Sequence, residues 1–433
     1  MGSVLATHRR PSAPRPLATS QTASQRAVKK ESVKALMMEQ RRQDDEQSER
    51  PVRVLQVVEN LNNQAVESWL LKVLCLSQEK HPHLDWTFFC VLGWPGKMDE
   101  AARRMGAKVI HSAHEIGEKM AFLGALRQVM RQDRYDVLHC HHDIMSALPL
   151  LASAGLPFRR RIVHVHNTSI GLPTTNPLKA ALVRAPFRQV CLRADQIVGV
   201  SQDALDAMLA GHKRRPGRDR VIHCGIETDR FRRDEARVCE LRHSFGFAPN
   251  AKILLFVGRM DAYKNPNFVI EVLSHLHKKD VNCAAVFAGT GPLEEEVREL
   301  ARQKHLKERM RVLGWRHDVP ELMQACDLLI WPGVEEPKEG LGLGIVEAQA
   351  AGLPVLMSRN VPEEAVVVPE LVKILPLSEG PQAWAEAVAA LLHRAHPARH
   401  ESLARVESSS FSIGQSTNNI ATLYAPKSLS EKS

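Results

Sequence analysis

Short apolar segments alternate with amphipathic helical segments along most of this chain, and the alternation runs twice. The first run extends from the apolar strand Val52–Val58 to Val221–His223, and the second starts at Lys252–Val257 and reaches Pro354–Met357. Strands separated by helical segments predict right-handed βαβ units and therefore a parallel sheet. Two such runs predict an α/β protein with two facing Rossmann-like domains. Ligands of these sheets bind outside the carboxyl ends of the strands, so the cleft between the domains is the expected site.

The same alternation sets the predicted domain limits, which are residues 1–50 for an N-terminal tail, 51–235 for the first domain, 236–405 for the second, and 406–433 for a C-terminal segment. The tail differs in composition, because its first thirty residues contain no Asp or Glu and are rich in Ser, Ala, Pro and Arg. We expect it to be disordered, or to reflect an early start with true initiation at Met37 or Met38. A transit peptide is the alternative interpretation.

The composition excludes several classes of protein. With 44% hydrophobic and 25% charged residues the chain is typical of a soluble globular protein. No apolar run approaches the ~18–20 residues that a membrane helix needs. The 8 cysteines are scattered without a C-x-x-C pair, which predicts free thiols in a reducing, cytoplasmic compartment and neither a disulfide framework nor a zinc site. The basic residues show no interleaved aromatics, so nucleic-acid binding is not expected.

The formal net charge of +9 has two interpretations. A basic tail and ordinary surface lysines would account for it. The alternative is peripheral contact with anionic lipid at the inner face of the membrane. The segment Ala180–Arg193, with Arg184, Arg188 and Arg193, could supply a cationic amphipathic helix for such contact, although a solvated helix face is the more common outcome.

The strongest functional signal is the stretch Pro337–Glu347, which follows a buried strand and opens a helix. The unpaired first amides of a helix, together with its dipole, favour a bound anion. Two carboxylates, Glu339 and Glu347, bracket the loop, and carboxylates accept hydrogen bonds from vicinal hydroxyls of a ribose or sugar. The loop glycines let a backbone approach a ligand closely, and they are Gly340, Gly342 and Gly344. The stretch therefore predicts a site for a phosphate and a sugar.

This stretch resembles the signature of the retaining glycosyltransferases of family 4, which have the GT-B fold. The family pattern is a strand ending in Pro, then E-x7-E within E-G-x-G-x-x-x-x-E-A, then A-x-G-x-P-V. The chain has Trp331-Pro332, then Glu339 through Ala348, then Ala351 through Val355. The resemblance covers roughly Arg53 to Tyr424 and implies a C-terminal helix that crosses back to the first domain.

The resemblance also implies roles for the residues of this loop. Glu339 would hold hydroxyls of the donor sugar, the amides of Leu341–Leu343 the sugar and diphosphate, and Glu347 the ribose. The positions between the two glutamates that are candidates for donor binding are Gly340, Leu341, Gly342 and Leu343.

A second element, Val257–Pro266, resembles the family's G-R-x-x-x-x-K-(G/N) motif. It contains Gly258 at a strand end, followed by Arg259 and Lys264. Two cations five residues apart can close on a pyrophosphate and neutralise the charge that develops on a departing nucleoside diphosphate. We therefore expect no metal at the donor site.

Weaker resemblances add further candidates. The segment Leu313–Asp318 resembles a family segment that lies by the nucleobase, so Trp315 and Arg316 are candidate nucleotide contacts. A histidine at the strand end of Val163–His166 reaches the donor sugar in the family, which implies that role for His166.

The run His139-Cys140-His141-His142-Asp143 also ends a strand and looks like a metal cluster. Adjacent strand residues alternate between the two faces of a sheet and cannot all reach one ion, so no metal site is expected there. His141 is either an acceptor-side residue or a buried structural histidine. One departure from the family lies after the first strand, where Gln64 and Ala65 occupy the usual Gly-Gly positions. Their side chains put acceptor-side activity in doubt more than donor binding.

The sequence thus predicts a retaining glycosyltransferase that moves a sugar from a nucleoside-diphosphate sugar to a glycan or lipid-linked acceptor. The expected donor is a UDP-sugar. No cofactor other than the donor is expected. A sugar-nucleotide epimerase on the same scaffold is one alternative. A non-catalytic sugar-nucleotide-binding protein, suggested by Gln64 and Ala65, is the other. A dinucleotide-dependent oxidoreductase does not fit, because no G-x-G-x-x-G follows the first strand.

Overall fold

A computed structural model describes residues 50–62, 65–169 and 177–425, with side chains left out for residues 177–184. Both sheets lie in the part of the chain that begins at Val52. The expected tail and the alternative starts at Met37 and Met38 lie outside the described residues. They remain predictions.

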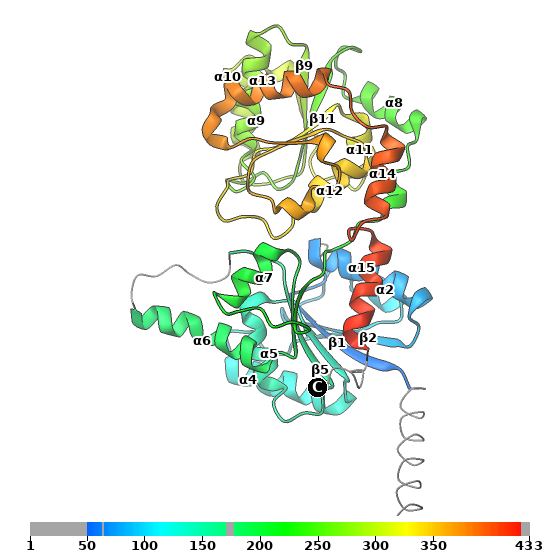
Figure 1. Cartoon of the computed structure of the whole chain (residues 1–433), viewed down its shortest axis with the longest axis vertical. Helices are drawn as coiled ribbons and strands as arrows, with labels where there is room; N and C mark the ends of the chain where they lie inside the picture. The colour runs from blue at the N-terminus through cyan, green and yellow to red at the C-terminus, as the bar shows by residue number, and fades with distance from the viewer. Residues whose placement is uncertain (1–49, 63–64, 170–176, 426–433) are drawn as a thin grey trace, which may run out of the picture. The chain divides into compact units, whose positions relative to one another are not determined.

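The first sheet has seven parallel strands in the order β3-β2-β1-β4-β5-β6-β7 (Figure 1). Its strands are β1 Val52–Val58, β2 Leu84–Cys90, β3 Lys108–His111, β4 Val137–Cys140, β5 Arg160–Val165, β6 Gln196–Gly199 and β7 Asp219–Val221. The helices connecting them are α2 Ala65–Lys80, α3 Asp99–Arg104, α4 Lys119–Asp133, α5 Ala147–Ala152, α6 Pro177–Arg193 and α7 Gln202–Leu209. Each strand therefore returns to the sheet through a crossover, as the alternating sequence pattern predicts.

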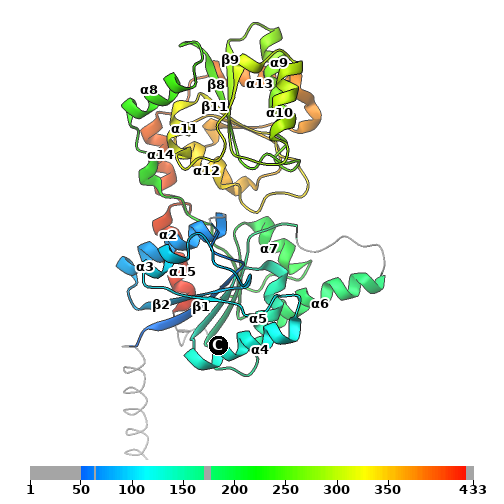
Figure 2. The same ribbon diagram turned by 180° about the vertical axis from the view of Figure 1, so that it is seen from behind.

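The second sheet has six parallel strands in the order β10-β9-β8-β11-β12-β13 (Figure 2). Its strands are β8 Lys252–Val257, β9 Cys283–Ala288, β10 Met310–Val312, β11 Leu328–Trp331, β12 Val355–Met357 and β13 Val372–Ile374. The accompanying helices are α8 Glu235–Ser244, α9 Pro266–Lys278, α10 Glu294–Gln303, α11 Val319–Ala325, α12 Leu343–Ala350, α13 Gly380–His393 and α14 Arg399–Glu407. Every residue of β9 and β11 is buried, as expected of parallel strands with both faces covered by helices.

The last helix, α15 (Ile413–Tyr424), packs against α2 of the first sheet, and both views show it there (Figures 1 and 2). The chain returns through a short parallel bridge, in which the Ile226 amide donates to Phe411 O at 2.8 Å and the Ile413 amide donates to Ile226 O at 2.9 Å. Trp69 of α2 donates from Nε1 to Ser416 Oγ at 3.0 Å. The predicted α/β fold with two parallel sheets and a returning C-terminal helix is therefore confirmed.

Candidate active site

A cavity of about 410 Å³ lies at the carboxyl ends of strands from both sheets. The first sheet's side contributes His166 and the start of α2, and the second contributes the loop that leads into α12. The lining includes these predicted site residues: Gly258, Lys264, Glu339, Leu341, Gly342, Leu343, Glu347 and His166. The sequence signals that were far apart along the chain therefore meet at one cavity.

The glycine-rich loop has two positions where only glycine fits. Gly342 is the N-cap of α12 and has φ +75°, in the left-handed region that side chains rarely adopt. A Cβ on Gly340 would meet the carbonyl oxygen of His166 at 1.8 Å. The close approach that Gly340 permits is therefore to the end of β5. It sets the loop beside the candidate histidine.

Glu339 is held by hydrogen-bond donors on one of its two carboxylate oxygens. Lys264 Nζ lies 2.6 Å from Glu339 Oε1, Trp331 Nε1 donates to the same oxygen at 3.0 Å, and Asn360 Nδ2 donates at 3.3 Å. Lys264 Nζ also lies 4.3 Å from the centre of the Trp331 ring. Among the described residues, none bonds to Glu339 Oε2. One oxygen is thus anchored by protein groups, while the other is able to accept further hydrogen bonds.

Glu347 lies in α12, part-buried at the cavity wall. Burial raises the pKa of its carboxyl, while the positive charges of Lys72 and Arg230 act in the opposite direction. No described residue forms a hydrogen bond or ion pair with this carboxylate. An ionised carboxylate that is partly desolvated and unpaired is well suited to accept hydrogen bonds from a diol.

His166 follows β5 and is oriented by a buried hydrogen-bond chain. Its Nε2 lies 3.0 Å from His141 Nδ1, and His141 Nε2 lies 2.9 Å from Gln56 Oε1. Gln56 Nε2 in turn donates to Tyr424 Oη of α15 at 2.8 Å. Burial lowers the pKa of both His166 and His141, so both rings are neutral near pH 7.

These contacts determine which ring nitrogens carry hydrogen. Gln56 Oε1 can only accept, so His141 carries its hydrogen on Nε2 and accepts at Nδ1. His166 must then donate from Nε2 to His141 Nδ1, which leaves His166 Nδ1 with a lone pair. Its backbone amide is also fixed, because it donates to Asp143 Oδ1 at 2.8 Å. His166 can therefore accept a hydrogen bond from a hydroxyl group in the cavity.

Four predicted site residues are not among the residues that line the cavity, namely Gly340, Arg259, Trp315 and Arg316. The Arg259 side chain is 73% exposed, and its Nε donates to Asp261. Arg316 Nε donates to Asp318 Oδ1 at 2.7 Å, and Trp315 is 63% exposed. Gln64 lies outside the described residues, whereas Ala65 begins α2 and lines the cavity.

Sequence reasoning missed several residues of the site. The sequence predicts Trp331 only as the end of a strand, and Asn360 belongs to no recognised motif, yet both donate to Glu339. Gln56 and Tyr424 are 368 positions apart in the chain, so no local pattern connects them. Burial in an apolar strand is the one signal that could have drawn attention to Gln56.

Comparison with known proteins identifies the family of both halves of the chain. Residues 55–230 match the family model described as Glycosyltransferase Family 4, and residues 239–405 match Glycosyl transferases group 1. The chain is 28% identical over 353 residues to the putative glycosyltransferase EpsF of Bacillus subtilis, which covers 80% of this chain and 89% of that protein.

Two further proteins extend the comparison. An Escherichia coli enzyme named UDP-Gal:alpha-D-GlcNAc-diphosphoundecaprenol alpha-1,3-galactosyltransferase is 24% identical over 276 residues, which cover 60% of this chain and 67% of that protein. HepE of Anabaena, solved in complex with UDP, has a similar fold, with a TM-score of 0.68 at 17% identity over 86% of this chain and 98% of that one. HepE has also been solved with UDP-glucose. The chain belongs to the group 1 and family 4 glycosyltransferases and is a nucleotide-sugar glycosyltransferase with the GT-B fold.

Proposed function

We propose that this chain is a hexosyltransferase that uses a UDP-sugar, retains the anomeric configuration, and acts on a glycan or lipid-linked acceptor. The observation that carries the proposal is the convergence of Glu339, Lys264, Glu347 and His166 on one cavity. The names of similar proteins support the choice of donor and acceptor, because one uses UDP-Gal on a diphosphoundecaprenol-linked sugar and another binds UDP-glucose.

Each wall of the cavity has a proposed role in donor binding. Glu347 accepts hydrogen bonds from the ribose, and the free oxygen of Glu339 accepts one from a sugar hydroxyl. The amides at the start of α12, near Leu343, bind the diphosphate. Lys264 and Arg259 neutralise the charge on the leaving group in place of a metal, and Arg259 must leave Asp261 to do so.

The proposed reaction is a same-face displacement. The bond from the anomeric carbon to the diphosphate oxygen breaks, and the acceptor oxygen bonds to that carbon on the same face. The acceptor proton passes to the departing diphosphate oxygen, so no protein nucleophile is required. His166 accepts a hydrogen bond from a sugar hydroxyl at Nδ1, which positions the donor sugar.

Peripheral membrane contact on the cytoplasmic side is part of the same proposal. No helix in the described part of the chain is long and apolar enough to cross a membrane. In α6, the side chains of Leu192, Arg188 and Arg193 are exposed, which supports contact with an anionic surface. Arg184 belongs to the residues whose side chains are not described. Binding to vesicles with anionic lipid, compared with neutral vesicles, tests this part.

Two alternative functions can be distinguished from this one by experiment. An epimerase would interconvert free sugar nucleotides, and a binding protein would hold them unchanged. Side chains at Gln64 and Ala65 motivate the second alternative, since Ala65 lines the cavity. Transfer of sugar to an acceptor, or release of UDP from the donor, excludes the binding protein.

The decisive test combines ligand-induced stabilisation with product analysis. Thermal midpoints are measured with UDP, UDP-glucose, UDP-GlcNAc and GDP-mannose for wild type, Glu347→Ala and the control Glu401→Ala, which removes an exposed carboxylate in α14. A ligand that binds the native state raises the midpoint by mass action. We expect a rise with one UDP-sugar that Glu347→Ala loses and Glu401→Ala keeps. No rise with any nucleotide would overturn the donor site, and an inverted anomeric product would overturn retention.

A further inference from the structure

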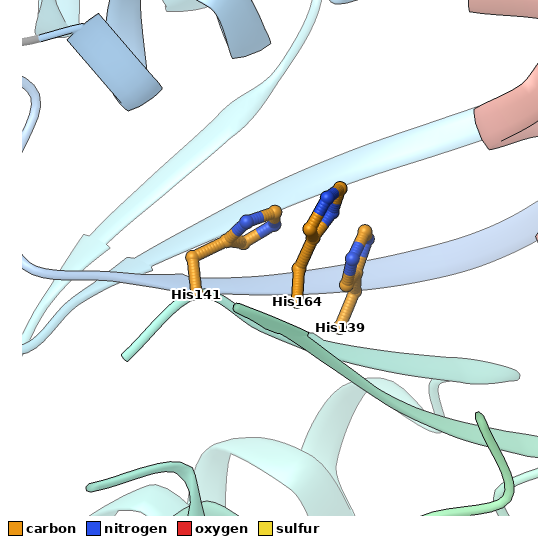
Figure 3. A group of neighbouring side chains, drawn as sticks. All are labelled: His139, His141 and His164. Carbon is orange, nitrogen blue, oxygen red and sulfur yellow. The ribbon is translucent and has the colours of Figure 1, made fainter. Parts of the chain in front are cut away.

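The first sheet carries histidines on two neighbouring strands, and the strand register brings them together. Cys140 of β4 pairs with Val163 of β5, so the next residues, His141 and His164, lie side by side. His139 precedes His141 by two positions and shares its face, since side chains on a strand alternate. Figure 3 shows the rings of His139, His141 and His164 on one side of these strands.

The three rings form a tight buried group. The ring centres of His139 and His141 are 4.2 Å apart, and those of His164 lie 5.4 Å from His139 and 5.5 Å from His141. His139 and His164 are 0% exposed and His141 is 8% exposed. One ring nitrogen from each residue lies within 4.8 Å of those of the other two.

Several ring nitrogens in this group lack a hydrogen-bond partner. Within the described residues, no protein group meets the geometry of a hydrogen bond to His139 Nε2 or to either nitrogen of His164, although the Ile222 backbone lies close enough to His164 to act on its pKa. Buried polar groups are normally hydrogen-bonded, and an exception calls for an explanation such as a bound ion. A fully buried imidazole without a well-aligned hydrogen bond on either nitrogen can ligate an ion. Two other histidines lie close enough to His164 to share that ion.

We propose that His139, His141 and His164 bind a late first-row divalent metal ion of the zinc type. Neutral imidazole suits zinc, copper, nickel and iron(II), and three histidines with one open position form a known zinc arrangement. Zinc–nitrogen bonds of ≈ 2.0–2.1 Å place ligand nitrogens roughly 3.4 Å apart. The ligand nitrogens of the three rings lie within 4.8 Å of one another, and ring rotations that move each nitrogen by on the order of 1 Å would bring them to that spacing. Water or hydroxide takes the open position.

The surrounding hydrogen bonds have the form that supports metal ligands. A ligating histidine usually donates its other ring N–H to a nearby oxygen, which fixes the ring. His139 Nδ1 lies 2.8 Å from Tyr424 Oη, and this leaves Nε2 for the ion. His141 Nε2 lies 2.9 Å from Gln56 Oε1, and this leaves Nδ1 for the ion. Two of the three ligands therefore have an oxygen next to one ring nitrogen, which leaves the other ring nitrogen to serve as the ligand atom.

The ion would be coupled to the transferase site through His141. Its Nδ1 accepts the hydrogen bond from His166 Nε2, so His141 cannot bind the ion and His166 at the same nitrogen. Metal binding would therefore release His166 from its anchor. The site is separate from the diphosphate position, where Lys264 supplies the positive charge.

A second group of potential ligands, Cys90, Asp99 and His111, does not carry the same inference. His111 Nε2 is already paired with Asp99 Oδ2 at 2.7 Å. Burial raises the pKa of the Cys90 thiol to about 12, which keeps the sulfur protonated.

The experiment measures metal binding directly on the full chain, with any affinity tag removed. After treatment with a chelator, the protein is dialysed against zinc and its metal content is measured, and cobalt(II) is added in parallel as a spectroscopic probe. We expect one tightly bound zinc per chain, and a visible absorption band typical of tetrahedral cobalt(II). At a free zinc concentration of 100 times the dissociation constant, the thermal midpoint should rise by about 3 °C.

Two variants assign the ion to the site. His164→Leu removes a ligand that has no well-aligned hydrogen bond, so it should fold and should lose the zinc, the cobalt band and the thermal shift. His142→Gln, a histidine next to His141 but outside the group, should retain all three. The proposal is overturned if wild type binds no zinc above the level of His164→Leu, or if the cobalt spectrum of wild type is that of an octahedral surface site.

Discussion

The ion pair between Lys264 and Glu339 leads to a prediction that separates stability from catalysis. Lys264→Met keeps the length of the side chain and removes its charge. The side chains of Lys264 and Glu339 are 19% and 11% exposed, so the carboxylate left behind is largely screened from water. Stranding a fully buried charge costs about 3–5 kcal/mol. Glu339 Oε1 keeps its hydrogen bonds from Trp331 and Asn360, so we expect a smaller loss of roughly 1–3 kcal/mol in the free energy of unfolding.

Catalysis should suffer more than stability in the same variant. Removing one preorganised charge from a leaving-group site costs roughly 10²–10³ in rate. We therefore expect Lys264→Met to lower kcat for sugar transfer by that factor. The double variant Lys264→Met/Glu339→Gln removes the stranded charge, so it should recover part of the stability, with a coupling energy of about 0.5–3 kcal/mol, and none of the activity.

Urea unfolding and initial transfer rates are the two assays, and the chain supplies a matched control. Lys279 and Glu386 form an ion pair of 2.7 Å that is 46% and 56% exposed. Exposed pairs contribute about 0–1 kcal/mol, so Lys279→Met should change neither stability nor rate appreciably. If Lys264→Met matches Lys279→Met in both assays, the assigned role of the Lys264–Glu339 pair is wrong.

Three further predictions concern buried groups. Burial raises the pKa of Glu347, so the native state keeps the proton of this carboxyl to a higher pH than the unfolded state does. The stability that the protonated carboxyl contributes therefore falls as the pH rises above about 4.5. Glu347→Gln should be more stable than wild type at pH 7.5 in thermal melting, and it should lose UDP binding. Tyr424→Phe leaves Gln56 Nε2 and His139 Nδ1 without their partner, so urea unfolding should show a loss of about 2–4 kcal/mol, with a smaller loss if water enters. Burial lowers the pKa of His164 to about 3 and of His142 to about 4, so below pH 6.5 the unfolded state binds more protons than the native state. At pH 5.5 each of these two histidines should lower the free energy of unfolding by about 1.4 kcal/mol relative to its value well above pH 6.5. In urea titrations, His164→Leu should therefore lose less stability on acidification than wild type.

The strands could be predicted from the sequence because parallel strands covered on both faces are continuous apolar runs. Val52–Val58 and Lys252–Val257 have the predicted bounds, and the strand predicted over Pro354–Met357 begins one residue later, at Val355. The edge strand β13 was missed, since its three residues alternate with a lysine and two of them are exposed. Short edge strands are defined by pairing with a neighbour, here β12, and carry little pattern of their own.

Part of the candidate site could be predicted because its residues lie in two local motifs. Glu339, Glu347 and Lys264 meet at the cavity as expected. The ion pair of Lys264 could not be predicted, because its partner Glu339 lies 75 residues away in the chain. The need for glycine at position 340 could not be predicted for the same reason. It is set by the carbonyl oxygen of His166, which follows a strand of the other sheet.

The histidines show where the reasoning from periodicity was incomplete. Alternation along a strand separates His141 from its neighbours Cys140 and His142, but positions two apart share a face, so His139 and His141 lie on the same side. The third member, His164, comes from the next strand and is visible only once the register is known. Because His141 also holds His166, a chain of neutral rings extends from the buried group to the cavity. Any change that protonates or ligates His141 must therefore alter the position or the tautomer of His166, and the catalytic rate should respond to events in the core of the first sheet.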